Sequence, residues 1–399
     1  WLRFRDLIIM RSDKLAQYEF LFIRNDLPLL IQRKLFIAPA KGLGVVRRAI
    51  FFSLLSWLPI AIWAAYQGRF MTVGDTSEPL LMHFGIHMRG LIAIPLLILA
   101  EALALKIGFH LIPQFVTSGL VPDDQREQFD QILLRAAKIR DAVLPWLIIF
   151  GVTLVWLLTS PADLSLHELS WASKRDGFGF GGWWFLYVTR TIFVILVLGW
   201  LWRMIMLTLL FWRISKLDLQ LVPTHPDKMG GLGFLQTFPA SLALVTFSMS
   251  LVLAGRWAHD SLYHHQSLDS FQMPLAVFVV SWSLILLLPL LLFAPKMAST
   301  RRQALKDYRA LLTKHGQLVH KRWILKQPVE QIELLDAPEI GPVADINQIY
   351  EAVEKMGTVP IGKMTILPVL APIVIPMLFV AATQMPLKEV FKTLLKALL

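Results

Sequence analysis

Apolar residues gather into seven long runs along this chain, and polar, mostly basic segments separate them. A helix needs about 20 consecutive apolar residues to cross the hydrocarbon core of a bilayer, and these runs approach or exceed that length. They lie at residues 49–66, 87–107, 142–159, 184–212, 237–257, 273–295 and 365–385. The pattern predicts an all-α integral membrane protein, built as a bundle of about seven transmembrane helices.

The seventh run carries prolines at four-residue intervals, at Pro368, Pro372 and Pro376. Each proline removes the hydrogen bond to the carbonyl four residues earlier, and an unpaired carbonyl is costly in lipid. We therefore expect six clear spans and a seventh element that is either a proline-broken span or a re-entrant segment. Its freed carbonyls are expected to face the protein interior or an oligomer axis, as in channels and transporters. The alternative is a packing kink, in which hydroxyl groups of neighbouring helices bind those carbonyls.

Polar segments complete the predicted organisation. A basic cytoplasmic or interfacial segment, 1–48, precedes the six-helix region, 49–295, which includes a helical loop at 113–141. A cytosolic helical segment, 296–364, follows, and 365–399 combines the proline-broken run with an amphipathic tail helix. None of the polar segments is long enough to form a separate enzyme domain.

Lysine and arginine are distributed unevenly between the two sides that these spans define. The N-terminal segment and the loops on its side hold 29 of them, whereas the opposite loops hold five. Basic residues concentrate on the cytoplasmic side of membrane proteins, so the N-terminus is expected in the cytoplasm. The asymmetry explains the net charge of +11 without a nucleic-acid partner. The expected partners are a bilayer with anionic headgroups, further copies of the chain, or other subunits of a membrane complex.

Composition supports this class and narrows the chemistry. The chain is 56% hydrophobic and only 17% charged, against about a quarter charged in soluble domains. It contains no cysteine, which excludes disulfides, thiolate metal sites and thiol catalysis. We expect no cofactor.

The C-terminal part has a recognisable layout. Residues 344–362 read ADINQIYEAVEKMGTVPIG, and the proline-broken run and a tail beginning PLKE follow. This layout resembles a group of uncharacterised bacterial inner-membrane proteins. The resemblance covers roughly the last sixty residues, and it implies a bacterial inner membrane and no particular activity.

Two charges lie deep inside the predicted spans. Glu101 lies near the cytoplasmic end of the second run, and Arg203 lies in the same half of the fourth. Charge within a membrane is costly and often functional, so we expect a Glu101–Arg203 pair. It would line a polar pathway or gate, or it would be a structural ion pair between two helices. Arg190 lies near the opposite interface, where a long side chain can reach water.

Histidines concentrate on the side with few basic residues. His83 and His87 are four positions apart, and so are Asp260 and His264 within RWAHDSLYHH. Imidazole and carboxylate groups suit zinc and related ions, and histidine also senses pH near neutrality. The candidate residues for either role are His83, His87, His259, Asp260, His264 and His265, and His167 lies on the same side. The alternative is a set of interfacial histidines with no joint role, since no HExxH motif is present.

A glycine-rich loop, PTHPDKMGGLGFL at 223–235, precedes the fifth run. Backbone N–H groups at Lys228, Gly230 and Gly231 would suit an anion or a lipid headgroup, although the spacing is not that of a GxxxxGK[ST] loop. The alternative is a tight cytoplasmic turn.

Three functions remain open at this stage. The first is a transport protein, channel-like or carrier, with its pathway near the proline-broken helix and the Glu101/Arg203 region. The second is a non-catalytic scaffold or subunit of an inner-membrane complex. The third is a membrane enzyme or metal-handling protein that uses the histidines. We assign no catalytic residue, because the apolar runs offer one acid, Glu101, and no deeply placed histidine.

Overall fold

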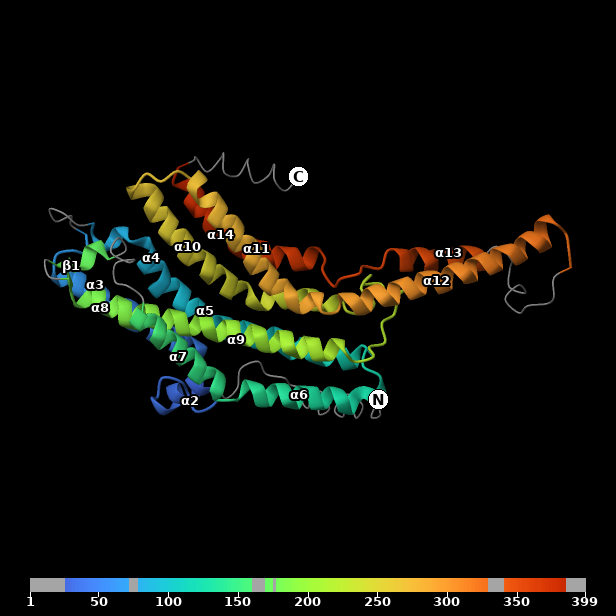
Figure 1. Ribbon diagram of the computed structural model, residues 1–399, viewed down its shortest axis with the longest axis horizontal. Coiled ribbons are helices and arrows are strands. Elements are labelled where there is room, and N and C mark those ends of the chain that lie inside the picture. The colour runs from blue at the N-terminus through green and yellow to red at the C-terminus, as the bar shows by residue number, and fades with distance from the viewer. Residues whose placement is uncertain (1–25, 72–77, 160–168, 175–176, 329–340, 385–399) are drawn as a thin grey trace, which may run out of the picture.

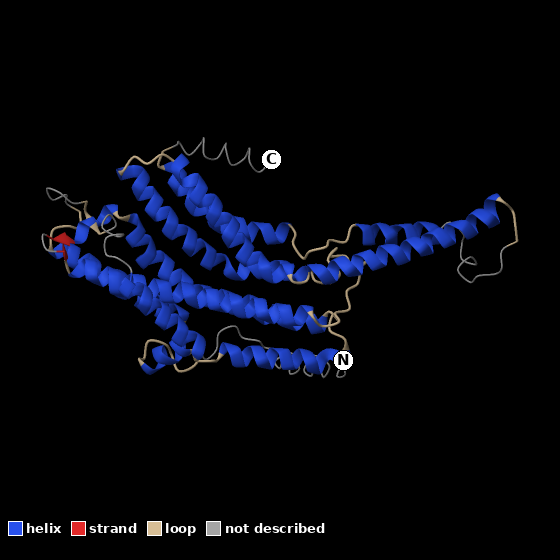
Figure 2. Cartoon of the chain, viewed as in Figure 1, coloured by secondary structure: helices blue, strands red, loops and turns tan. Residues whose placement is uncertain are grey.

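The computed structural model of the chain is an elongated bundle of α-helices (Figures 1 and 2). The structure describes residues 26–71, 78–159, 169–174, 177–328 and 341–384. Within these ranges, 7 helical segments are long and apolar enough to span a membrane: Val45–Tyr66, Phe84–Thr117, Asp123–Thr159, Phe180–Ser215, Gly233–Tyr263, Asp269–Leu291 and Lys363–Ala382. The chain is therefore an all-α, multi-pass membrane protein, as the apolar runs predict.

The helices follow the apolar pattern with short irregular joints. In chain order they are α2 Leu27–Lys34, α3 Val45–Tyr66, α4 Phe84–His87, α5 Ile94–Thr117, α6 Arg126–Arg140, α7 Leu144–Thr159, α8 Phe180–Trp184, α9 Arg190–Ser215, α10 Ala243–Tyr263, α11 Asp269–Leu291, α12 Ala294–Val319, α13 Gly341–Glu354 and α14 Lys363–Ala382. Short π-helical turns join α4 to α5 at Met88–Ala93 and α8 to α9 at Phe185–Thr189. Two short antiparallel strands, β1 Ser173–Lys174 and β2 Gly177–Phe178, precede α8.

The two ends of the bundle differ. Helices α12 and α13 pack side by side and extend beyond one end, which we call the projecting end (Figure 1). The other end, which we call the histidine end, carries β1, β2 and the residues Glu78, His259 and His264. Helix α14 starts at the projecting end, and Thr383 and Gln384 beyond it bond Ser261 at the histidine end, at 2.9 and 2.8 Å. Helix α14 therefore crosses the whole bundle, and the re-entrant alternative is wrong.

The three prolines do not interrupt α14, because the helix continues through all of them. Pro372 and Pro376 are buried where α14 packs along α10. Ser250 of α10 donates a hydrogen bond from Oγ to the carbonyl of Ile373, at 2.8 Å. The proline face is thus turned towards a neighbouring helix of the same chain, and not towards an oligomer axis. The carbonyls that the prolines free belong to Met364, Pro368 and Pro372, so the Ser250 bond adds to the packing of α14 on α10 and does not replace one of the lost helical bonds.

Burial separates the central helix from the lipid-facing ones. In α10 and the turn before it, 61% of the most apolar stretch is buried, against 17% for the α6–α7 segment and 22% for α11. Towards the projecting end, a cluster of aromatic rings ties α5, α6 and α9 to the turn before α10 and to the joint between α11 and α12. Its members are Phe115, Phe129, Phe211, Phe234 and Phe293. Helices with mostly exposed apolar faces are expected where lipid is the solvent.

Candidate functional site

Four buried charged side chains meet between α3, α5 and α9. Arg48 Nη1 of α3 lies 2.5 Å from Glu101 Oε2 of α5. Arg203 Nη2 of α9 lies 3.2 Å from Glu101 Oε1 and 2.7 Å from Oδ2 of Asp26, which precedes α2. Each of the four side chains is at most 8% exposed. The pair predicted between Glu101 and Arg203 is present, and it belongs to a larger network.

The network is electrically balanced, with two arginines and two carboxylates. Removing ions from water costs several kcal/mol each, so buried charges persist only when they are paired and hydrogen-bonded. Arg48 has a further acceptor in Gln32 Oε1, at 2.5 Å from its Nε. Within the described part of the chain, Oδ1 of Asp26 is buried and has no hydrogen-bond partner. One acceptor in the network therefore remains available to a donor.

Aromatic rings hold Arg203 in place. Its guanidinium lies 5.0 Å from the ring centre of Trp200 and 5.9 Å from that of Trp146, within the range of cation–π attraction. Trp146 of α7 reaches this position because it packs on Gly199, where an added Cβ would lie 2.9 Å from the indole. The sequence thus needs a small residue at position 199 to bring α7 onto α9 beside the network.

A pocket of about 430 Å³ opens from the network. Its walls come from α3, α7 and α9, with part of α2 over one end. The walls are apolar, and Phe51, Leu55, Phe150 and Ile195 are among them, whereas the four network residues and Gln32 supply the polar end. A pocket with one polar end and apolar walls matches a molecule that has a polar head and an apolar body.

Arg190 is not part of this network. Its guanidinium lies 4.7 Å from the ring centre of Trp156, so it stacks on an aromatic side chain of α7. Arg190 and Arg203 of α9 thus have different surroundings, and of these two only Arg203 joins the buried carboxylates.

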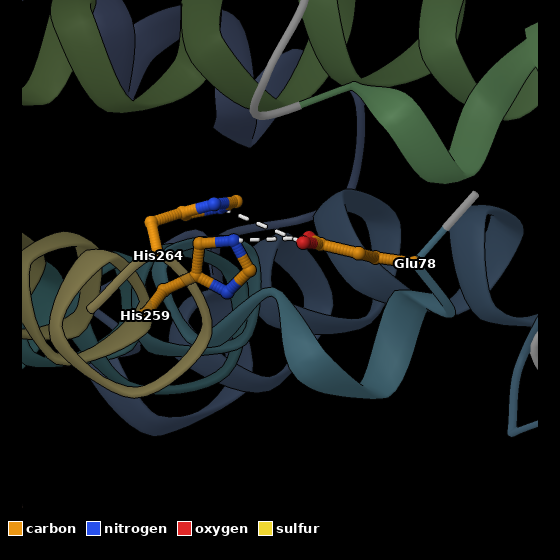
Figure 3. Close-up of side chains that lie close together, drawn as sticks. All are labelled: Glu78, His259 and His264. Carbon is orange, nitrogen blue, oxygen red and sulfur yellow. Dashed lines mark ion pairs between the residues drawn. The ribbon is translucent and has the colours of Figure 1, made fainter. Parts of the chain in front are cut away.

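At the histidine end, Glu78, His259 and His264 converge (Figure 3). Nε2 of His259 lies 3.2 Å from Oε2 of Glu78, and Nε2 of His264 lies 3.5 Å from Oε1. His83 is buried beside them, with its ring stacked on that of His259 at 4.7 Å and its Nε2 3.6 Å from Glu78 Oε2. Three of the predicted histidines therefore lie together, and Glu78 is the carboxylate they share.

The other predicted members of this group lie apart from the cluster. His87 accepts a hydrogen bond at Nδ1 from Trp57, at 2.8 Å, and its Nε2 lies 3.0 Å from the carbonyl of Leu80. The nearest cation to Asp260 is Arg256, at 3.9 Å. His265 is exposed just beyond α10, and His167 lies outside the described residues. His87 therefore does not join the carboxylate of Glu78, because both of its ring nitrogens already have partners.

The glycine-rich loop binds its own carboxylate. Asp227 accepts hydrogen bonds from the backbone N–H groups of Met229, Gly231 and Gly233, at 2.7–3.2 Å. Burial alone would raise the pKa of Asp227, but these N–H groups and His225 hold it below its ordinary value. The loop is therefore the tight turn that was the alternative to an anion or headgroup site at Lys228, Gly230 and Gly231, and the carboxylate of Asp227 occupies the place of an external anion. Positive φ angles at these three residues fit that turn.

Sequence reasoning missed Asp26, Arg48 and Glu78. Arg48 stands at the start of the first apolar run, in VVRRAIFF, where an arginine is expected to reach the headgroups. Asp26 and Glu78 lie in polar segments outside every apolar run. The charge of Arg48 next to an apolar run is a signal that could have pointed to the network, whereas neither acid has such a signal.

No family model, curated protein or solved structure matches this chain. The two features that bear on function are the buried network with its pocket and the cluster at the histidine end.

Proposed function

We propose that this chain is a membrane transport protein of the carrier type, and that its substrate is an amphiphile. The polar head would lie at the Asp26–Arg48–Glu101–Arg203 network and the apolar body along α3, α7 and α9. The observation that carries the proposal is the pocket of about 430 Å³, which joins a buried, charge-balanced end to apolar walls inside the membrane-spanning bundle.

The chemistry of the pocket narrows the substrate class. The network is neutral, so it favours a headgroup without a large net charge. The free acceptor at Asp26 Oδ1 favours a headgroup with a hydrogen-bond donor, such as an amine or a hydroxyl. Apolar walls that include Phe51, Phe150 and Ile195 would pack against an acyl or other hydrocarbon chain.

A carrier fits this geometry better than an ion channel. Ion pathways replace the hydration shell of the ion with carbonyl oxygens or charged side chains. Beyond the polar end, the walls of this pocket are apolar and cannot do so. The proline-bearing helix α14, which the sequence placed near a pathway, packs on α10 through its proline face. The proline face of α14 is therefore packed against another helix of the same chain.

We further propose a bacterial inner membrane with the projecting end in the cytoplasm. Lysines and arginines number 29 on the N-terminal side of the predicted spans and five on the other, and the positive-inside rule places the richer side in the cytoplasm. The histidine end would then face away from the cytoplasm.

A scaffold is the second candidate, and α12–α13 favours it. Arg309 of α12 donates to the Tyr350 hydroxyl of α13 at 2.9 Å, and Arg301 donates to the carbonyl of Glu354 at 2.8 Å. These contacts hold the pair together as an arm beyond the bundle (Figure 1), a form suited to holding a partner protein.

A lipid-redistribution assay tests the carrier proposal. The purified chain is placed in liposomes that contain phosphatidylethanolamine with a fluorescent NBD group on one acyl chain, and a reductant added outside reports lipid that reaches the outer leaflet. We expect the wild-type chain to speed this exchange. The variant Leu196→Trp places a larger side chain in the pocket from α9, and we expect it to lose most of the acceleration of lipid exchange.

The matched control is Ile205→Trp, which also replaces an aliphatic residue with tryptophan but at an exposed position of the same helix, and it should keep wild-type exchange. Equal exchange by both variants would contradict the role of the pocket. Absence of exchange in the wild type, together with retention of co-purified partner proteins, would favour the scaffold.

A further inference from the structure

The cluster of Glu78, His259 and His264 at the histidine end is a second site, independent of the proposed transport pocket (Figure 3). We propose that it binds one divalent first-row transition-metal ion, of which zinc is the representative, through the carboxylate of Glu78 and the Nε2 atoms of both histidines. Three observations carry the proposal: the tautomer of His259, the spacing of the ligand atoms, and the types of ligand present.

The tautomer of His259 follows from its backbone contact. Its Nδ1 lies 2.8 Å from the carbonyl oxygen of Met82, which can only accept a hydrogen bond. In the neutral ring, the proton is therefore on Nδ1 and Nε2 carries a lone pair. That lone pair points towards the Oε2 atom of Glu78, 3.2 Å away, which is also an acceptor. Two facing acceptors repel each other unless a proton or a metal ion lies between them.

These two atoms are unsatisfied in the interior of the protein. Among the residues that the structure describes, neither Nε2 of His259 nor Oε2 of Glu78 makes a hydrogen bond, and both atoms are buried. A buried polar atom without a partner destabilises the fold, because it has lost its hydrogen bonds to water and gained none. A metal ion bound by both atoms removes that cost and the repulsion between them.

The spacing of the ligand atoms fits a metal ion. Zinc binds nitrogen and oxygen at about 2.0–2.2 Å, so two ligands at a tetrahedral angle lie about 3.3–3.6 Å apart. The separations from the Glu78 carboxylate are 3.2 Å to His259 and 3.5 Å to His264. All three ligand atoms lie within 4.8 Å of one another.

The surroundings also match a metal site. A histidine ligand usually donates its other ring N–H to a carbonyl or a carboxylate, which fixes the orientation of the ring, and the Met82 carbonyl does this for His259. His83 stacks on His259 and lies 3.6 Å from the same carboxylate, so it closes one side of the site. Its Nε2 also contacts Oγ of Ser170, at 3.1 Å.

The ligand set selects the class of ion. Two imidazoles and one carboxylate suit zinc, nickel, cobalt or ferrous iron, whereas calcium and magnesium prefer oxygen ligands alone. Three protein ligands leave a fourth position for water or for an incoming molecule, as in zinc sites that bind substrate. His264, just beyond α10, is about a quarter exposed, and it gives the ion access from outside.

Zinc binding to the purified full-length chain tests this assignment. The protein is treated with a chelator, and zinc is titrated by calorimetry while calcium serves as the negative probe. We expect one zinc ion per chain and no calcium. Glu78→Gln and His264→Ala should each weaken zinc binding at least tenfold, and zinc should raise the thermal midpoint of the wild type but of neither variant.

The matched control is His265→Asn, which changes the adjacent, exposed histidine. Asparagine tolerates the left-handed backbone at that position, where φ is 52°. This variant should bind zinc like the wild type.

Glu78 and His264 lie outside helices, and the thermal midpoints of the metal-free variants verify that they fold. If the folded wild type takes up no stoichiometric zinc, or if both ligand variants bind it normally, the cluster is a hydrogen-bonded ion pair around a protonated His259 and the proposal is wrong.

Discussion

Nη1 of Arg48 lies 2.5 Å from Oε2 of Glu101, although 53 positions separate the two residues. The second carboxylate oxygen of Glu101 accepts from Arg203, at 3.2 Å. One buried glutamate thus links α3, α5 and α9, and it sets the position of the two arginines at the polar end of the pocket.

Replacing Glu101 with glutamine should strongly destabilise the bundle. The change removes a charge that two buried arginines share, and an uncompensated buried charge costs about 3–5 kcal/mol. We expect a loss of about that size, measured by reversible denaturant unfolding in detergent. The control is Glu351→Gln, which breaks the exposed pair with Lys355 at 3.2 Å and should change stability by less than about 1 kcal/mol. Equal effects of the two changes would show that Glu101 is not held as described.

Asp227 should contribute a pH-dependent part of the stability. Because its pKa is lower in the folded chain than its ordinary value, its stabilisation is complete above that ordinary value, about 3.9. The stabilisation is lost as pH falls from about 4 through the lower, folded-state pKa. At neutral pH, Asp227→Asn should cost about 1–2 kcal/mol, because hydrogen bonds to a charged acceptor are lost.

The measurement for Asp227 is the unfolding free energy as a function of pH. The Asn variant should lose less stability than the wild type between about pH 4 and pH 2. Asp345→Asn on the exposed face of α13 provides the comparison and should leave the profile unchanged. A wild-type profile that is identical to that of Asp227→Asn would contradict the internal-anion role of the loop.

Gly181 should tolerate no side chain. A Cβ at this position would lie 2.5 Å from the ring of Trp63 and 2.8 Å from that of Trp171, both of them rigid indoles. We expect Gly181→Ala to cost about 1–3 kcal/mol, as overpacking does, and to lower the thermal midpoint. Gly151→Ala on α7 is the control, because nothing lies within 4 Å of its added Cβ, and it should be neutral or stabilising.

The two ends of the bundle should label from opposite sides of the membrane. The chain has no cysteine, so single cysteines can be introduced without a background. Ser267→Cys lies at the histidine end, and Thr313→Cys lies on α12 at the projecting end; both positions are exposed. With an impermeant maleimide, we expect Ser267→Cys to react on intact cells and Thr313→Cys only after permeabilisation. The reverse result would invert the proposed orientation, and labelling of both from one side would contradict the crossing order.

The sequence predicted the membrane-spanning part well because that signal is local. A run of about 20 apolar residues is long enough to cross the hydrocarbon core as a helix, and exposing it to water would be unfavourable. The positions of the spans can therefore be read directly from contiguous residues. The Glu101–Arg203 pair was predictable for a related reason, since both charges lie inside apolar runs and at similar depth.

The remainder of the network was not predictable in this way. Asp26 and Arg203 are 177 positions apart, and they meet at 2.7 Å. Asp26 lies outside the apolar runs, so nothing in the neighbouring residues indicates that its charge is buried and paired. Glu78 likewise precedes α4 in a loop, and only the packing of α10 brings His259 to it.

By itself, the sequence determined that this chain is an all-α, multi-pass membrane protein, because hydrophobic length is a property of contiguous residues. It also placed the three prolines on one face, because helical periodicity is local. Only the tertiary structure decided that α10 covers that face, that Asp227 fills the glycine-rich loop, and that Asp26 and Arg48 join Glu101 and Arg203. Those outcomes depend on contacts between distant segments, whose energies arise only when the helices pack.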